Sequence, residues 1–277
     1  MQEHACRFGR ASHLIGITGQ PHAAANAADG VGVIVLNAGL VHRIGPFRLH
    51  VEMTRHLNAI GYPTLRFDLS TLGDSSASGE PQSHEQQVCA DVADAIALLS
   101  EQSSCTRFIL IGLCSGAANA HLVARSDARV AGAIFLDGYA YRSFGFQLRH
   151  YLPRILNAVR SAHSLVRRMR LGRQLREPSF GVEFPSRDKV RGDLVEMLER
   201  GLKLCFIYSG GFSKYFNHCR QFRECFGSIS SHPGISVRFF KETDHTYILT
   251  CDRMRLLDNI DDWMRGNFPI VASHGQA

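Results

Sequence analysis

Short apolar runs alternate with segments of helical periodicity along most of the chain. The apolar runs are rich in Val, Ile, Leu and Phe and predict buried strands at 31–36, 64–69, 107–112, 130–137, 204–209 and 235–240. Apolar side chains at helical spacing predict helices at 50–60, 84–100, 115–126, 188–200 and 252–265. Strands that alternate with helices and are apolar throughout are typical of a parallel sheet covered on both faces. We therefore expect an α/β fold with a mostly parallel, doubly wound sheet. Near the start, residues 13–21 predict an antiparallel strand at the sheet edge, and the alanine-rich stretch 23–30 predicts the turn that follows it.

The composition of the 277 residues is that of an ordinary globular protein. The formal charge of +6 is a mild excess that does not by itself indicate a nucleic-acid partner. There is no run of about 18 apolar residues that could span a membrane, and the N-terminus lacks an apolar signal segment. The eight cysteines contain no CxxC pair. We therefore expect a cytoplasmic protein with free thiols and with neither a cofactor nor a metal site.

A glycine-flanked cysteine stands between the predicted strand 107–112 and the predicted helix 115–126, in the sequence FILIGLCSGA. In a G-x-nucleophile-x-G turn the middle residue has a strained backbone, and larger residues in place of the glycines would clash. The middle residue is Cys114, at a helix N-terminus, where the helix dipole favours a thiolate. Ser115 is expected to contribute its backbone N–H to an oxyanion hole. The alternative is that Cys114 is an inert thiol in a structural turn.

Four ordered motifs resemble the α/β-hydrolase superfamily over nearly the whole chain. They are NAGLVHRIGP at 37–46, LRFDLSTLGDS at 65–75, the Cys114 turn, and Asp-His-Thr at 244–246 before the terminal helix. The resemblance implies the α/β-hydrolase fold, with an oxyanion loop after the third strand in which Gly39 or Leu40 supplies an N–H. Within the superfamily the chain looks most similar to small hydrolases of exopolysaccharide and polyketide gene clusters, including exosortase-associated hydrolases. The elbow carries a cysteine in place of the commoner serine. In this it resembles the elbows of dienelactone hydrolases and polyhydroxyalkanoate synthases, which use Cys-Asp-His.

His245 is the expected general base. It follows the last predicted strand, and the carboxyl ends of parallel strands are where such sheets build sites. A nucleophile that precedes the histidine in the chain is also the order of this family. Among the fourteen histidines, the alternatives are His42, His121 and His218.

The third member of a catalytic triad is less obvious. The family usually places an acid after the strand 204–209, but residues 209–218 contain no carboxylate. Asp137 ends the preceding strand, and some α/β-hydrolases take their acid from that position. Asn217 and Ser213 are the alternatives, and Asp244 is expected to point away from its neighbour His245.

A basic insertion separates two of the core strands. Residues 138–176 contain nine arginines and no Asp, Glu or Lys, so the rest of the chain has a formal charge of −3. The resemblance places a lid here, which gives a core of 1–137 and 186–277 with a helical lid at 138–185. An arginine-rich lid attracts acidic partners. We therefore expect an acyl thioester substrate, on acyl carrier protein or coenzyme A, and no nucleic acid.

Three functions are compatible with these residues. The first is a thioesterase or esterase that hydrolyses its substrate through an acyl-Cys114 intermediate. The second is an acyltransferase that passes the acyl group to an alcohol, amine or thiol. The third is a binding protein without activity, which the missing carboxylate after strand 204–209 would favour.

Overall fold

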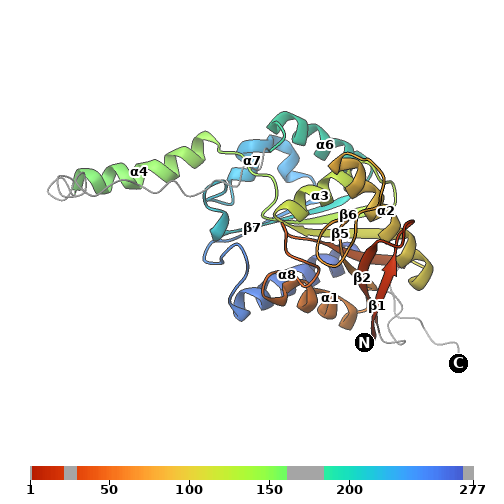
Figure 1. Ribbon diagram of the computed structural model, residues 1–277. Helices are drawn as coiled ribbons and strands as arrows, with labels where there is room; N and C mark the ends of the chain where they lie inside the picture. The colour runs from red at the N-terminus through yellow and green to blue at the C-terminus, as the bar shows by residue number, and fades with distance from the viewer. Residues whose placement is uncertain (1, 22–29, 161–183, 271–277) are drawn as a thin grey trace, which may run out of the picture.

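The computed structural model describes residues 2–21, 30–160 and 184–270, without the side chains of 153–160. In these residues one sheet has eight strands in the order β1-β2-β4-β3-β5-β6-β7-β8 (Figure 1). Its strands are β1 (Gln2–Phe8), β2 (Leu14–Gln20), β3 (Val31–Leu36), β4 (Thr64–Asp68), β5 (Arg107–Leu113), β6 (Val130–Leu136), β7 (Lys203–Ser209) and β8 (Ile235–Phe240). β2 is antiparallel to both β1 and β4, and all other pairs are parallel. The predicted mostly parallel sheet is confirmed.

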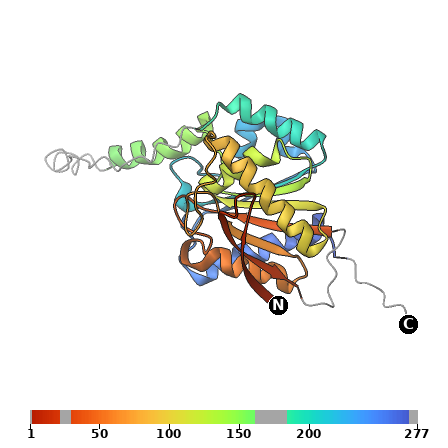
Figure 2. The ribbon, with the colours of Figure 1, turned by 45° about the vertical axis from the view of Figure 1, so that its right-hand side comes forward.

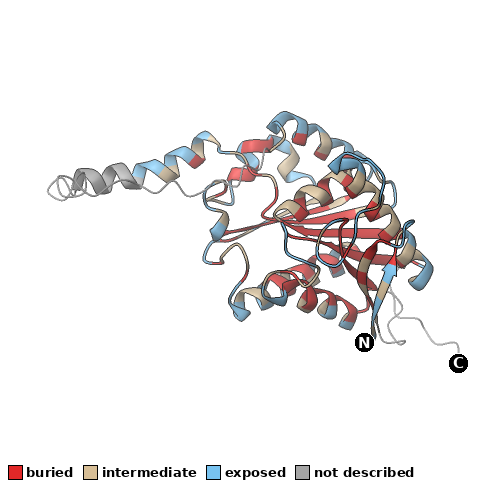
Figure 3. Cartoon of the chain, in the orientation of Figure 1, coloured by how far each residue is buried: buried red, intermediate tan, exposed pale blue. Residues whose placement is uncertain are grey.

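Helices cover both faces of this sheet. α2 (His84–Ser103), α3 (Ser115–Ala124), α6 (Arg187–Glu199) and α7 (Gln221–Phe226) pack on one face, and α1 (Leu49–Ala59) and α8 (Thr250–Asn267) pack side by side on the other. The strands between them are buried along their length, as Figure 3 shows. A strand buried on both faces has no polar side, which is why its sequence is a continuous apolar run.

The predicted elements lie within a few residues of their observed bounds, except at the N-terminus. The strand predicted at 13–21 is β2, and it is not an edge strand because β1 pairs outside it. β1 was not predicted because its sequence is mostly polar and exposed. Tertiary ion pairs help to hold it, since Glu3 binds Arg55 at 2.7 Å and Arg66 at 2.8 Å. The turn predicted at 23–30 falls almost entirely outside the described residues.

The described part of the basic insertion, residues 138–160, contains α4 (Phe144–Arg160). Its first turns contact α7 through two hydrogen bonds from Arg149 to Glu224, of 2.8 and 3.0 Å. The helix then extends away from the sheet in two views (Figures 1 and 2). Residues 161–183 of the predicted lid and seven of its nine arginine side chains are not described, so the lid stays a prediction. Within the described ranges, no helix combines the length and apolar character needed to cross a membrane.

Candidate active site

The turn between β5 and α3 has the geometry predicted for a nucleophile elbow. Cys114 lies at its tip with φ 57° and ψ −115°, a conformation that L residues rarely adopt. A Cβ on Gly112 would lie 2.1 Å from the carbonyl group of Gly116, and a Cβ on Gly116 would lie 2.4 Å from the Asn37 carbonyl oxygen. Both glycines are therefore required for the strand and the helix to approach this closely.

Replacement of Gly116 by Ala is expected to disrupt this turn. The new methyl group collides with backbone, which cannot rotate aside as a side chain can, so we expect a loss of about 3 kcal/mol in the free energy of unfolding. Urea denaturation measures it. Gly192→Ala is the matched control, because Gly192 lies in α6 with open space at its Cβ position. That change is expected to stabilise the protein by about 0.5–1 kcal/mol. Equal effects at the two positions would contradict the steric account.

His245 and Asp137 meet at the carboxyl end of the sheet. His245 follows β8, and its Nδ1 lies 2.7 Å from Oδ2 of Asp137. Asp137 directly follows β6, with φ 48° and a side chain that is fully buried. Cys114 also lies close enough to the His245 side chain to raise its pKa. The structure thus brings the predicted sulfur, imidazole and carboxylate into one continuous chain of contacts.

These contacts change the proton affinity of the imidazole. The hydrogen bond to Asp137, and next the interaction with Cys114, raise the pKa of His245 to about 10, against the opposing effect of burial. His245 is therefore protonated at neutral pH. It donates Nδ1–H to Asp137 and keeps Nε2–H for the sulfur.

Ser209 is a site residue that the sequence analysis missed. Its N–H and its hydroxyl donate to the two carboxylate oxygens of Asp137, each at 2.6 Å. Ser209 ends β7, the strand after which the family usually places its acid. It therefore holds the carboxylate supplied by the neighbouring strand β6. The signal in the sequence was a hydroxyl residue at that strand end.

The alternative third members are engaged elsewhere. Asn217 accepts a hydrogen bond from Arg149 at 3.1 Å and donates to the Phe146 carbonyl at 3.2 Å, so it is bound to α4. Ser213 lies in the loop after β7, where its N–H donates to the Gly210 carbonyl. Asp244 accepts hydrogen bonds from Thr246 and Ile248 within its own loop, and among the described hydrogen bonds none joins its carboxylate to the His245 ring.

The alternative histidines lie apart from Cys114. Nε2 of His121 lies 2.9 Å from Oδ2 of Asp193 on α6. Nδ1 of His218 accepts the N–H of Arg220 at 3.1 Å. His42 is exposed on the loop after β3. None of the three has a described contact with the elbow.

The loop after β3 lies against the elbow. The N–H of Gly39 donates to the hydroxyl of Ser115 at 2.7 Å, and Gly39 has φ 57°. Leu40 is 88% exposed, and within the described residues its N–H has no acceptor. The Ser115 N–H at the start of α3 likewise has none. Of the predicted oxyanion donors, Ser115 and Leu40 thus have free N–H groups, and that of Gly39 is occupied.

Asn37 fixes the position of this loop. Its side chain is buried, donates to the Val41 carbonyl at 3.0 Å and accepts the Leu69 N–H at 2.7 Å. Asp68 at the end of β4 accepts from the Arg43 backbone in the same loop. The loop is therefore organised in advance for binding.

Two cavities meet at Ser115, the residue next to Cys114, and Cys114 itself is in the lining of neither of these two. One of about 330 Å³ has the apolar side chains of Leu40, Leu69, Leu72 and Val88 in its wall. The other, of about 220 Å³, has a charged wall that includes Arg125, Lys189 and Asp193. Ser115 and Asn119 line both cavities. The elbow therefore faces space that a substrate could fill.

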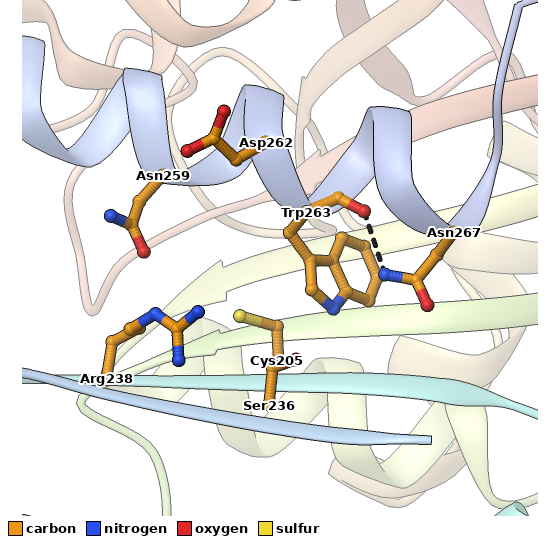
Figure 4. A pocket seen from close by; sticks show the side chains of 7 residues that line it. All are labelled: Cys205, Ser236, Arg238, Asn259, Asp262, Trp263 and Asn267. Carbon is orange, nitrogen blue, oxygen red and sulfur yellow. Dashed lines mark hydrogen bonds between the residues drawn. The ribbon is translucent and has the colours of Figure 1, made fainter. Parts of the chain in front are cut away.

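A third cavity, of about 210 Å³, lies between the sheet and α8. Figure 4 shows the Cys205 thiol in it beside Arg238 and Trp263. Burial raises the pKa of Cys205 to about 12, so this thiol is a poor nucleophile. The described residues hold no group of three or more His, Cys, Asp or Glu side chains suited to a metal ion.

A comparison with models of protein families matches residues 33–271 to the alpha/beta hydrolase family. The chain belongs to the α/β hydrolase family. This membership agrees with the strand order, the elbow and the position of His245 after β8. The chain is accordingly an enzyme of the hydrolase type. A comparison with curated proteins finds no match.

Solved structures of similar fold include hydrolases and esterases. An esterase of Pyrococcus furiosus, Pf2001, has a TM-score of 0.63 and 13% identity, over 96% of this chain and 91% of the esterase. A serine hydrolase of Xanthomonas campestris, described as without a lid, has a TM-score of 0.58 and 13% identity, over 98% and 97%. A serine hydrolase homologue of Coxiella burnetii has a TM-score of 0.57 and 13% identity, over 94% and 95%. At such identity the likeness shows the fold. One of these proteins is described as a serine hydrolase and another as a serine hydrolase homologue, whereas this elbow carries cysteine.

Proposed function

We propose that this α/β hydrolase is a thioesterase or esterase with Cys114 as its nucleophile. The observation that carries the proposal is the contact chain from Cys114 through His245 to Asp137, at a strained elbow that borders two cavities. The imidazolium of His245 is placed to give a proton to the leaving group when the sulfur attacks.

In the proposed reaction the Cys114 sulfur attacks the acyl carbon and a tetrahedral oxyanion forms. The free N–H groups of Ser115 and Leu40 are the candidate donors to that oxyanion. The intermediate collapses, the bond to the leaving group breaks, and His245 gives the leaving group its proton. Water then attacks acyl-Cys114 with His245 as general base, and the acid product leaves.

Asp137 orients the imidazole and stabilises its positive charge. The alternative of a binding protein without activity thereby loses its main support, because the missing carboxylate after β7 is supplied by β6. Transfer to a second substrate in place of water is the other candidate, and the charged cavity beside Ser115 supports it as a place for an acceptor.

The substrate belongs to the proposal as well. The apolar cavity suits an acyl chain, and the arginines at 138–176 suit an acidic carrier such as acyl carrier protein or coenzyme A. Arg142 and Arg149 of that segment are already engaged, by the Lys214 carbonyl and by Glu224. A role in exopolysaccharide or polyketide pathways, suggested only by the resemblance to hydrolases of such gene clusters, is kept as part of this proposal.

Alkylation by iodoacetamide tests the activation of the thiol. At pH 6.5 we expect Cys114 to react at least about tenfold faster than added N-acetylcysteine, because the imidazolium of His245, which stays protonated up to about pH 10, lies beside its sulfur. Mass spectrometry gives both rates in one sample. In His245→Ala the Cys114 rate should fall to that of N-acetylcysteine. Equal rates in the wild-type protein would refute the proposal of an activated thiol.

A further inference from the structure

The hydroxyl of Ser115 has an unusual hydrogen-bonding arrangement. It accepts the N–H of Gly39 at 2.7 Å, so one of its lone pairs is occupied and its position is fixed. A hydroxyl can donate as well as accept. In the part of the chain that the structure describes, Ser115 Oγ–H has no acceptor, and the side chain lines both cavities beside Cys114.

We infer that this hydroxyl is a further donor to the oxyanion. The inference rests on the proposed function, because it concerns the same tetrahedral intermediate. The hydroxyl belongs to the residue after the nucleophile, whose backbone N–H is already a candidate donor. Both groups come from Ser115 and border the space that the substrate would enter.

The Gly39 bond explains how the hydroxyl is held in place. Gly39 sits at the tip of the loop that Asn37 fixes, and its N–H is the group that would otherwise serve the oxyanion directly. By donating to Ser115 Oγ it orients the hydroxyl and makes its hydrogen a stronger donor. The loop thus acts on the oxyanion through the serine, while the Leu40 N–H stays free.

No proton leaves the serine in this step. The Cys114 sulfur forms a bond to the carbonyl carbon, and the π electrons of the carbonyl move to its oxygen. That oxygen accepts hydrogen bonds from the Ser115 N–H and Oγ–H. When the carbonyl re-forms, the bond to the leaving group breaks, His245 supplies the proton of the leaving group, and Ser115 returns to its initial state.

A hydroxyl that obstructs the oxyanion site would have the opposite effect on the rate from a hydroxyl that donates to it. If the hydroxyl only occupied the place of the oxyanion and had to move away, its removal would free Gly39 and raise the rate. If it donates, its removal lowers the rate. The two roles therefore differ in the sign of the effect of Ser115→Ala.

The experiment compares Ser115→Ala and Ser115→Thr in the full chain with the N-acetylcysteamine thioester of butyrate. Ser115→Ala is expected to lower kcat by about 10²-fold, the usual effect of losing one oxyanion donor, with little change in KM. Ser115→Thr keeps a hydroxyl and should retain kcat within about tenfold of the wild type. An unchanged or higher kcat in Ser115→Ala would overturn the inference.

Alkylation by iodoacetamide provides the matched readout. It occurs at a saturated carbon and forms no oxyanion, so the rate at Cys114 should stay within about twofold in Ser115→Ala. A parallel fall in alkylation would mean that the change damages the elbow, and it would contradict a role in oxyanion binding. If the wild-type protein forms no acyl-Cys114, the proposed function itself fails. If it does and Ser115→Ala is equally fast, only the role of the hydroxyl fails.

Discussion

Cys114→Ala is expected to lower kcat/KM for hydrolysis of the butyryl thioester by about 10⁴–10⁶-fold. Single removals of a triad nucleophile in other hydrolases have effects of this size, because the covalent route is lost entirely. The methyl group of alanine also leaves the fold intact, since the cysteine side chain is only partly buried. The measurement is the initial rate of free-thiol release, with the thioester in excess over the enzyme, as a function of thioester concentration; it gives kcat/KM.

Two further variants serve as controls for Cys114→Ala. Cys219→Ala removes an exposed thiol on the loop before α7 and should leave kcat/KM unchanged. Cys114→Ser keeps the shape of the elbow but supplies a hydroxyl, which ionises far less readily than a thiol, so its activity should fall well below that of the wild type. Retention of a tenth or more of the activity by Cys114→Ala would mean that another group is the nucleophile.

Asp137→Asn is expected to lower kcat by about 10²–10⁴-fold at pH 7. The amide preserves the size of the side chain, but it cannot compensate the positive charge that His245 carries, and it can hold the ring in the wrong tautomer. Asp258→Asn on the exposed surface of α8 is the control and should retain wild-type activity. Equal activity of Asp137→Asn and Asp258→Asn would show that the Asp137 carboxylate does not orient His245.

Asp137→Asn is also expected to change how the free energy of unfolding depends on pH. The pKa of His245 is raised in the folded state to about 10, above its ordinary value of 6.5. Its contribution to stability is therefore fully present below about pH 6.5 and is lost as the pH rises through about 10. Urea unfolding should show the largest difference between the wild type and Asp137→Asn near pH 6, and a smaller one at pH 10. A difference that grows with pH would contradict the ion pair.

Much of the site follows from local sequence. The paired glycines around Cys114 predict a sharp turn because each one faces backbone at a distance that no side chain could fit. The end of β8 predicts the place of His245, since parallel strands end at one edge of a sheet. The assignment of the carboxylate depends on strand pairing, which is not local. β6 and β7 are neighbours in register, Leu136 opposite Ile207, and this pairing brings Asp137 and Ser209 together.

Other features could not be predicted for identifiable reasons. β1 has a polar sequence and is held by pairing with β2 and by the ion pairs of Glu3, so its own residues give no apolar pattern. The occupied N–H of Gly39 depends on the orientation of the Ser115 side chain across two loops. The engagement of Asn217 by Arg149 depends on where α4 begins. Apart from the pairing of β1 with β2, these contacts join segments that are far apart in the sequence.

The most direct test of the account is to look for the acyl group on Cys114. The protein is mixed with the butyryl thioester, quenched in acid within the first turnover, digested and analysed by mass spectrometry. The predicted result is a butyryl group on the peptide that contains Cys114, and no such group in Cys114→Ala. When the acyl group is introduced chemically, it should persist longer in His245→Ala than in the wild type. Turnover of the thioester with no acyl group on that peptide at any time, or with the group on another residue, would contradict it.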